Sequence, residues 1–306
     1  MKAKGYSADG MWRTLLLAVA LLLGACDAAN ELVNGDDEDV YYYVSLGTSL
    51  AVGVQPDSNG LLLPTNDGYA DVLFDNIRPG FRNTGAQNRD LEHIMLGCPG
   101  ESLDDMINGG NCPYIAGSQL AAAVDFLSEN QGRIHLVTID MGANDFRGAN
   151  CIDTTVDMTC INTVSAQIAT DLATVLAALR DAAGPNVTIV GMNYYNPFLG
   201  SWLEGAAGQT LAMETAQGVG VLNDFLSTTY GTAGVPIADV AVAFDSDNFT
   251  TIVPSPLPAP NDMLPQSVAN ICTFTFMCDP GPVGPDIHAT DAGYSLIADT
   301  FEAELP

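Results

Sequence analysis

Short apolar segments alternate with longer segments of helical periodicity from residue 40 to the end of the chain, and this alternation constrains the fold most. The apolar segments are rich in Val, Ile, Leu and Tyr, as β-strands are. Strands are expected at residues 40–46, 91–96, 135–141, 187–194 and 237–244. Amphipathic or Ala/Leu-rich helices are expected at residues 69–77, 119–130, 164–183, 210–229 and 292–304.

Continuous apolar strands that alternate with helices are typical of a parallel sheet covered on both faces. The prediction is therefore a single three-layer α/β/α domain of the flavodoxin-like class, with a five-stranded parallel sheet, over residues 40–306. Residues 246–285 are rich in Pro, Asp and Asn and are expected to form a long ordered excursion from it.

The amino terminus has the pattern of an export signal. Lys2, Lys4 and Arg13 precede an apolar segment, residues 14–25, that is too short to span a bilayer but suits a signal-peptide core. It ends in Leu23-Gly24-Ala25-Cys26, which resembles a bacterial lipobox, where cleavage leaves the cysteine as a lipid-bearing first residue. We expect a lipoprotein signal at residues 1–25 and a membrane tether through lipid on Cys26, on the periplasmic or cell-surface side. A plain secretory signal with an incidental cysteine is the alternative.

Acidity excludes one class of partner. The chain carries 37 Asp and Glu against 9 Lys and Arg, a formal net charge of −28, so it is not expected to bind nucleic acid, which proteins hold through Lys and Arg. Residues 26–39 are polar and acidic and are predicted to be a flexible tether. A hydrophobic fraction of 47% is nevertheless enough to build a core.

Six cysteines follow Cys26, and an even number in an exported protein predicts disulfides. Six cysteines allow fifteen pairing patterns, and proximity in the sequence favours the one with three local bridges. The expected bridges are Cys98–Cys112, Cys151–Cys160 and Cys272–Cys278. A zinc site is the competing interpretation, but the chain has no CxxC pair or histidine cluster, and no metal is expected.

In a parallel sheet the functional residues gather at the carboxyl ends of the strands. Four polar or glycine positions lie in such loops. Ser49 follows Gly47 after the first strand, Gly100 follows the second, Asn144 follows the third, and His288 precedes the last helix. Ser49 could serve as a nucleophile, Gly100 and Asn144 could donate N–H groups to an oxyanion, and His288 could act as a base.

Each of these residues also has an ordinary structural interpretation. Ser49 could cap a helix, and Gly100 and Asn144 could be turn residues. Asp145 is expected to fix its loop by accepting backbone N–H groups. His93 and His135 lie in or beside predicted strands and are expected to be structural.

Taken together, the four segments resemble the SGNH/GDSL hydrolase family. The resemblance lies in Gly47-Thr48-Ser49-Leu50, in Gly100, in Gly142-Ala143-Asn144-Asp145, and in His288 followed by Gly293-Tyr294. Residues 194–199 are also similar to a stretch found in bacterial lipase-like members. The resemblance spans about residues 40–303, and four short blocks in the right order and spacing are specific where each alone is weak.

The resemblance implies a serine esterase that needs no cofactor. Ser49 would attack the acyl carbonyl, and His288 would take its proton. The backbone N–H groups of Ser49 and Gly100 and the amide of Asn144 would hold the oxyanion, and water would release the acyl group.

Two positions depart from the family pattern. Thr48 stands where the family usually has Asp, which puts the support of the nucleophile loop in doubt. The Asp that orients the histidine usually lies three residues before it, where this chain has Pro285; Asp286 lies two before. Asp286 is the predicted orienting residue, and a backbone carbonyl near Pro285 is the alternative.

The expected activity is hydrolysis of small-molecule or lipid carboxylic esters by a monomer. Lipase-like or short-chain esterase activity is the first expectation, and removal of acetyl groups from carbohydrate is the second. A non-catalytic surface binding protein on the same scaffold is a third, which the retained Ser49, Gly100, Asn144 and His288 disfavour. A nucleotide-binding module would need a glycine-rich phosphate loop, and the sequence has none.

Overall fold

The computed structural model describes residues 39–82 and 89–306. The predicted signal peptide, Cys26 and all but the last residue of the predicted tether lie outside the described residues. The central sheet contains β1 (Asp39–Gly47), β4 (Arg89–Met95), β5 (Ile134–Asp140), β6 (Thr188–Met192) and β7 (Ile237–Ala238). Its order is β4-β1-β5-β6-β7 and every pairing is parallel, which is the flavodoxin-like arrangement. The predicted fold class is therefore confirmed.

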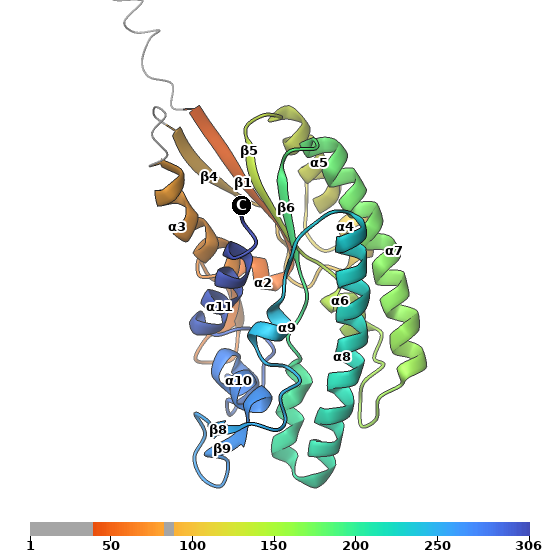
Figure 1. Ribbon diagram of the computed structural model, residues 1–306, viewed down its shortest axis with the longest axis vertical. Helices are drawn as coiled ribbons and strands as arrows, with labels where there is room; N and C mark the ends of the chain where they lie inside the picture. The colour runs from red at the N-terminus through yellow and green to blue at the C-terminus, as the bar shows by residue number, and fades with distance from the viewer. Residues whose placement is uncertain (1–38, 83–88) are drawn as a thin grey trace, which may run out of the picture.

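Helices cover both faces of this sheet (Figure 1). On one face α3 (Tyr69–Arg82) packs against α11 (Asp291–Glu302). On the other, α7 (Met158–Ala183) lies between α5 (Gln119–Glu129) and α8 (Ala206–Thr232). The strands are almost wholly buried between these layers: the last five residues of β5 and the last four of β6 are all buried. The continuous apolar character of the strands follows from this two-sided burial.

The last predicted strand, residues 237–244, is wrong beyond its first two residues. The chain leaves the sheet after Ala238 and forms α9 (Val240–Ala243). Asp239 ends the strand because its carboxylate caps this helix, accepting the N–H of Val242 at 3.1 Å and the side-chain amide of Asn193 at 2.7 Å. Capping by an acid has overridden the strand preference of the Val and Ala residues that follow it.

The remaining elements are short, and the sequence patterns did not reveal most of them. They are α2 (Ser49–Val52), β2 (Val54–Pro56), β3 (Leu62–Pro64), α4 (Leu103–Asn108), α6 (Ala143–Gly148), η1 (Pro197–Glu204), β8 (Ile252–Pro254), β9 (Met263–Pro265), α10 (Gln266–Phe274) and η2 (Phe276–Cys278). The last four build the excursion predicted at residues 246–285. Most of these elements follow the carboxyl ends of the strands, the edge on which the predicted site loops lie.

Three disulfides tie local loops together, and they join the pairs that sequence proximity predicts: Cys98–Cys112, Cys151–Cys160 and Cys272–Cys278. Disulfides of this kind persist in oxidising compartments, which fits an exported protein. Within residues 39–82 and 89–306, no helix has the length and apolar character needed to cross a membrane.

Candidate active site

The loop after β1 places Ser49 as the first residue of α2, with Thr48 in the N-cap position. Thr48 uses both its N–H and its hydroxyl to bind the carboxylate of Asp140, at 2.9 and 3.0 Å. Asp140 is fully buried at the end of β5, and burial raises its pKa to about 7. The loop is thus supported without the Asp that the family usually has at position 48.

Gly47 is fixed from a second direction. Its N–H donates to the side-chain oxygen of Gln119 at 2.7 Å, and its carbonyl accepts from the amide nitrogen of Gln119 at 3.0 Å. Gln119 also donates to Glu101, a fully buried carboxyl whose pKa burial raises to about 7. A side chain at position 47 would collide with Asp140, and φ there is +138°, so glycine is required.

Two further loops supply the predicted oxyanion donors. Gly100 adopts φ +78°, in the left-handed region, and Asn144 lies in the first turn of α6. The amide nitrogen of Asn144 donates to the carbonyl of Glu101 at 2.9 Å, which joins the two loops and leaves a second amide N–H for a substrate. Asp145 accepts the N–H of Leu103 at 3.1 Å with both oxygens, so its predicted role of fixing the loop is confirmed.

His288 and Asp286 form a hydrogen-bonded pair in the loop before α11. Nδ1 of His288 lies 2.7 Å from Oδ1 of Asp286, and the same oxygen accepts the backbone N–H of His288 at 2.9 Å. Burial acts to raise the pKa of Asp286, but the hydrogen bonds from His288 and the positive charge of Arg147 outweigh it and lower that pKa. A carboxylate two residues before the histidine therefore reaches the ring, as the sequence predicts.

Backbone pairing holds this histidine loop in place. Phe276 of η2 donates its N–H to the carbonyl of His288 and accepts the N–H of Asp286, both at 3.1 Å. Tyr195 donates its hydroxyl to the carbonyl of Ile287 at 2.6 Å and stacks on Phe244. The segment at residues 194–199, which resembles a lipase-like stretch, thus supports the loop that carries His288.

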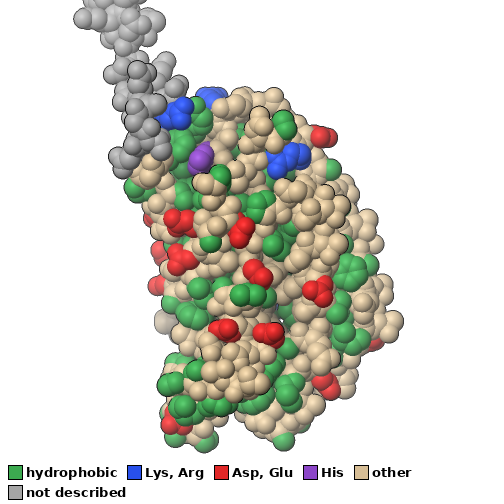
Figure 2. Space-filling view, in the orientation of Figure 1, with side chains coloured by type: hydrophobic (Ala, Val, Ile, Leu, Met, Phe, Trp, Pro, Cys, Tyr) green, Lys and Arg blue, Asp and Glu red, His purple; other side chains and the backbone are tan. Residues whose placement is uncertain are grey.

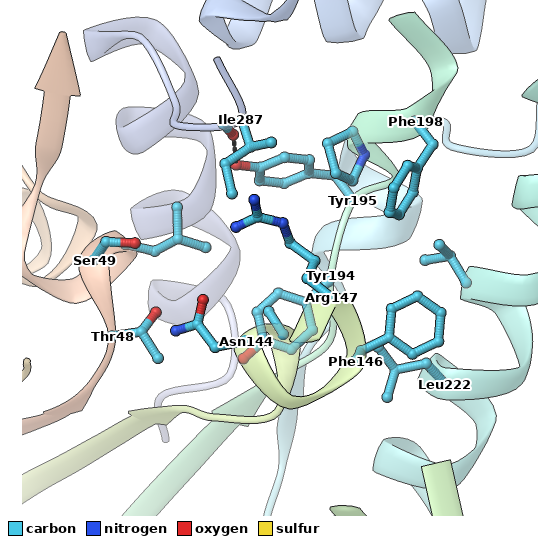
Figure 3. Close-up of a pocket in the computed structure, with 14 residues that line it drawn as sticks. Thr48, Ser49, Asn144, Phe146, Arg147, Tyr194, Tyr195, Phe198, Leu222 and Ile287 are labelled. Carbon is cyan, nitrogen blue, oxygen red and sulfur yellow. Dashed lines mark hydrogen bonds between the residues drawn. The ribbon is translucent and has the colours of Figure 1, made fainter. Parts of the chain in front are cut away.

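A narrow cavity of about 50 Å³ opens beside Ser49 (Figure 3). Ser49, Thr48 and Asn144 lie at one end, and the aromatic rings of Phe146 and Phe198 lie at the other. Its wall is mostly apolar and also includes Leu50, Tyr194, Tyr195, Pro197, Val219, Leu222 and Ile287. A wider cavity of about 430 Å³ adjoins it, lined by Gly100, Gly148, Asn150, Cys151 and Ile152, and the two share Asn144, Phe146, Arg147 and Phe198.

The structure therefore brings Ser49 and Asn144 to one cavity and Gly100 and Asn144 to the next. His288 is 7% exposed and lines neither, although its neighbour Ile287 lines the first. Among the described residues no hydrogen bond joins Ser49 to His288. Catalytic contacts of this kind are often long without substrate and shorten when it binds.

Arg147 is the polar residue of this site that the sequence reasoning missed. It lies three residues after Asn144 in α6, close to one helical turn further along, and lines both cavities. Its position next to the Asn144 block was the one signal available. The contacts of Gln119 and Glu101 were also missed, because Gln119 lies 72 residues from Gly47 in sequence.

A second set of Ser, His and Asp side chains in contact lies elsewhere in the structure, and it has no access to substrate. Ser45 lies 2.8 Å from Nε2 of His93, and Nδ1 of His93 lies 3.5 Å from Asp71. Ser45 is fully buried within β1, and His93 stacks on Tyr43. Ser45 lines neither of the two cavities described above, and these contacts assign His93 a structural role, as the sequence predicts.

Comparison with known proteins identifies similar sequences and similar folds. Residues 45–296 match the GDSL-like Lipase/Acylhydrolase family. The fold is similar to that of an extracellular lipase from Streptomyces rimosus, with a TM-score of 0.52 and 16% identity over 85% of this chain and 99% of the lipase. It is also similar to the lipase Lip_vut3 from a goat rumen metagenome, with a TM-score of 0.50 and 14% identity over 86% of this chain and 96% of that one. No curated protein matches the sequence significantly.

Proposed function

The chain belongs to the GDSL-like lipase/acylhydrolase family, and we propose that it is a serine esterase that cleaves short-chain carboxylic esters through an acyl-enzyme on Ser49. Membership of the family supports ester hydrolysis in general. The observation that carries the finer proposal is that Ser49 and Asn144 share one apolar cavity beside a loop that holds the His288–Asp286 pair.

In the proposed reaction His288 takes the proton of the Ser49 hydroxyl as its oxygen attacks the acyl carbonyl. Asp286 engages Nδ1 of His288, so Nε2 is the nitrogen left to accept that proton. The N–H groups of Ser49 and Gly100 and the Asn144 amide stabilise the oxyanion. His288 then protonates the leaving alcohol, and water, activated by the same histidine, releases the acid and restores Ser49.

The narrow cavity favours a short acyl group. A volume of about 50 Å³, walled by buried side chains such as Tyr194 and Leu222, favours an acyl chain of only a few carbons. In contrast, lipase-like action on long-chain esters has its own supporting observation. Leu61, Leu62 and Leu63 are 43–59% exposed on the β2–β3 hairpin, and Gly60 beside them packs against Pro282 in the loop leading to His288.

A panel of p-nitrophenyl esters graded by chain length tests both candidates. We expect kcat/KM to be highest for acyl chains of two to about four carbons and to fall steeply beyond them. A maximum at eight or more carbons would favour the lipase-like candidate. Ser49→Ala should abolish turnover of every member and labelling by a fluorophosphonate, and residual turnover within tenfold of the wild type would refute the acyl-enzyme.

We also propose that the protein is exported and tethered to a membrane by lipid on Cys26. Its three disulfides support export. Labelling with a radioactive fatty acid in the native host should mark the wild type and not a Cys26→Ser variant. Release of the wild type into the medium without label would instead favour a plain secretory signal.

A further inference from the structure

Arg147 has a position unlike that of any other arginine whose side chain the structure describes. Arg78, Arg89, Arg133 and Arg180 lie at or near the amino ends of the strands, where each has a hydrogen-bonding, ionic or aromatic partner. Arg147 alone of these five lies at the carboxyl ends, in the loop region that carries Ser49 and Asn144. Figure 2 shows the same bias on its visible face, with basic side chains near the amino-terminal end of the sheet and acidic ones spread below.

The guanidinium of Arg147 is available to a ligand. It is exposed and makes no hydrogen bond or ion pair within the part of the chain that the structure describes. Figure 3 shows it extending from α6 toward Ile287 and Tyr195, between Ser49 and the aromatic rings of the cavity. Its charge reaches the catalytic region, because it contributes to lowering the pKa of Asp286.

The two cavities divide the space around the reacting carbonyl. The narrow one is walled by Leu50, Val219 and Leu222 and suits a hydrocarbon acyl group. The wide one opens past Gly100 and Asn144 to the polar residue Asn150 and has about 430 Å³ for the alcohol portion. Arg147 lies on the wall that the two cavities share, so an alcohol portion in the wide cavity passes its guanidinium.

From this arrangement we infer that the preferred substrates are esters whose alcohol portion carries an anionic group, a carboxylate or a phosphate, which pairs with Arg147. The inference rests on the proposed esterase function and adds the substrate class. A chain with a net charge of −28 repels anions at long range, so an anionic substrate needs a local cation to be held at all. A guanidinium supplies this best, since its planar fork matches both carboxylate and phosphate oxygens.

A set of acetyl esters that differ only in charge tests this inference. The substrates are 3-acetoxybenzoate and 3-acetoxyphenyl phosphate as anions, methyl 3-acetoxybenzoate as the neutral analogue, and 3-acetoxy-N,N,N-trimethylanilinium as the cation. For each enzyme the ratio of kcat/KM for the anionic to the neutral ester is measured, and comparison between enzymes cancels the intrinsic reactivity of each ester.

We expect Arg147→Gln to lower the anionic-to-neutral ratio about tenfold, which corresponds to about 1.4 kcal/mol, and to raise the cationic-to-neutral ratio. Arg147→Lys should give an intermediate ratio, because it keeps the charge and loses the fork. The control is Arg133→Gln, at an exposed arginine just before β5, which should leave every ratio unchanged. The anionic ester whose ratio falls more in Arg147→Gln, the carboxylate or the phosphate, identifies which anion the site prefers.

Ratios that stay within twofold of the wild type in Arg147→Gln would overturn the inference while leaving the esterase proposal intact. An equal effect of Arg133→Gln would also overturn it, because the discrimination would then come from overall charge. Absence of wild-type hydrolysis of all four acetyl esters would overturn the proposed function and this inference with it.

Discussion

Asp286 is the proposed orienting residue of His288, a role that residue spacing alone left open. Its carboxylate contacts both Nδ1 and the backbone N–H of His288, which fixes the ring and the tautomer together. We predict that Asp286→Asn lowers kcat by about 10²- to 10⁴-fold, because an amide would not stabilise the protonated imidazole. Steady-state kinetics on a short-chain ester would measure this.

The control for this prediction is Asp279→Asn. Asp279 is an exposed acid seven residues earlier in the same loop region and should tolerate the change. Turnover by Asp286→Asn equal to that of Asp279→Asn would remove Asp286 from the triad and leave a backbone carbonyl as the orienting group.

Thr48 shows how one substitution is compensated by a neighbour. Thr48 donates hydrogen bonds to Asp140 through its N–H and its hydroxyl. The acid that supports the nucleophile loop is therefore at the end of β5 and not at position 48. We predict that Thr48→Asp destabilises the protein by several kcal/mol, because it would place two carboxylates in one buried site. The loss of unfolding free energy in urea should be larger at pH 8 than at pH 5, where one carboxyl can keep its proton.

Thr48→Val is the matched comparison. It removes the hydroxyl hydrogen bond and adds no charge, so the expected cost is about 1–2 kcal/mol with less dependence on pH. Thr48→Asp that is as stable as the wild type at pH 8 would contradict this account of the loop.

At the scale of the elements, two of the disulfides close segments that hold the site loops in place. Cys98–Cys112 closes the segment that includes Gly100, and Cys272–Cys278 closes the segment that includes Phe276. Phe276 forms two backbone hydrogen bonds with the histidine loop. The Cys272–Cys278 bridge therefore supports the position of His288 through η2.

We predict that Cys272→Ala with Cys278→Ala lowers kcat about tenfold or more, at temperatures where the variant remains folded. Cys151→Ala with Cys160→Ala is the control, since the bridges span similar separations of 6 and 9 residues and should each contribute about 2–3 kcal/mol of stability. Methyl acetate is a suitable substrate, because its one-carbon alcohol portion extends least into the wide cavity that Cys151 lines. Equal effects of the two double variants on kcat would show that the bridge near η2 acts on stability alone.

Periodicity predicted the long elements well, because burial on one or two faces imposes it. The helix expected at residues 164–183 is the carboxyl-terminal part of α7, and the strand at 135–141 is β5 shifted by one residue. Three-residue elements such as β2 and β3 are too short to show a period, and β7 ends early because Asp239 caps α9 instead of continuing the strand. Periodicity therefore fails for very short elements and for an element, such as β7, whose end is set by one side chain.

The candidate site likewise contains residues that the sequence predicts and residues that it does not. Ser49, Gly100, Asn144 and His288 stand in short blocks that can be read one at a time, and the strand ends bring their loops to one edge. Contacts between distant segments carry no local signal, as with Gln119 and Gly47 or Tyr195 and Ile287. The residues that support the site loops could therefore be identified only from the structure.

For the whole molecule, buried carboxyls and surface acidity act on stability in the same direction. Burial raises the pKa of Asp140 and of Glu101 to about 7, whereas both would be near 4 in the unfolded chain. Between about pH 4 and pH 7 the unfolded chain therefore releases protons that the folded protein retains, and a rise in pH favours unfolding. Ionisation of the many exposed acids adds self-repulsion over the same range.

Asp286 acts in the opposite sense. Its pKa is lowered in the folded protein, so the stability it contributes is present above its unfolded pKa and is lost as the pH falls below about 4. These opposing groups place the maximum of stability in the acidic range, near pH 4–5.

We therefore predict that the unfolding free energy, measured in urea, is lower at pH 8 than at pH 5 by a few kcal/mol. Glu101→Gln should narrow that difference by about 2–3 kcal/mol, because the amide does not titrate. This expectation holds even if the substitution also changes the unfolding free energy by an equal amount at both pH values. Glu129→Gln, at an exposed position on α5, should leave the difference unchanged. If the wild type proved at least as stable at pH 8 as at pH 5, the buried carboxyls would ionise at little cost, and the raised pKa of Glu101 would be wrong.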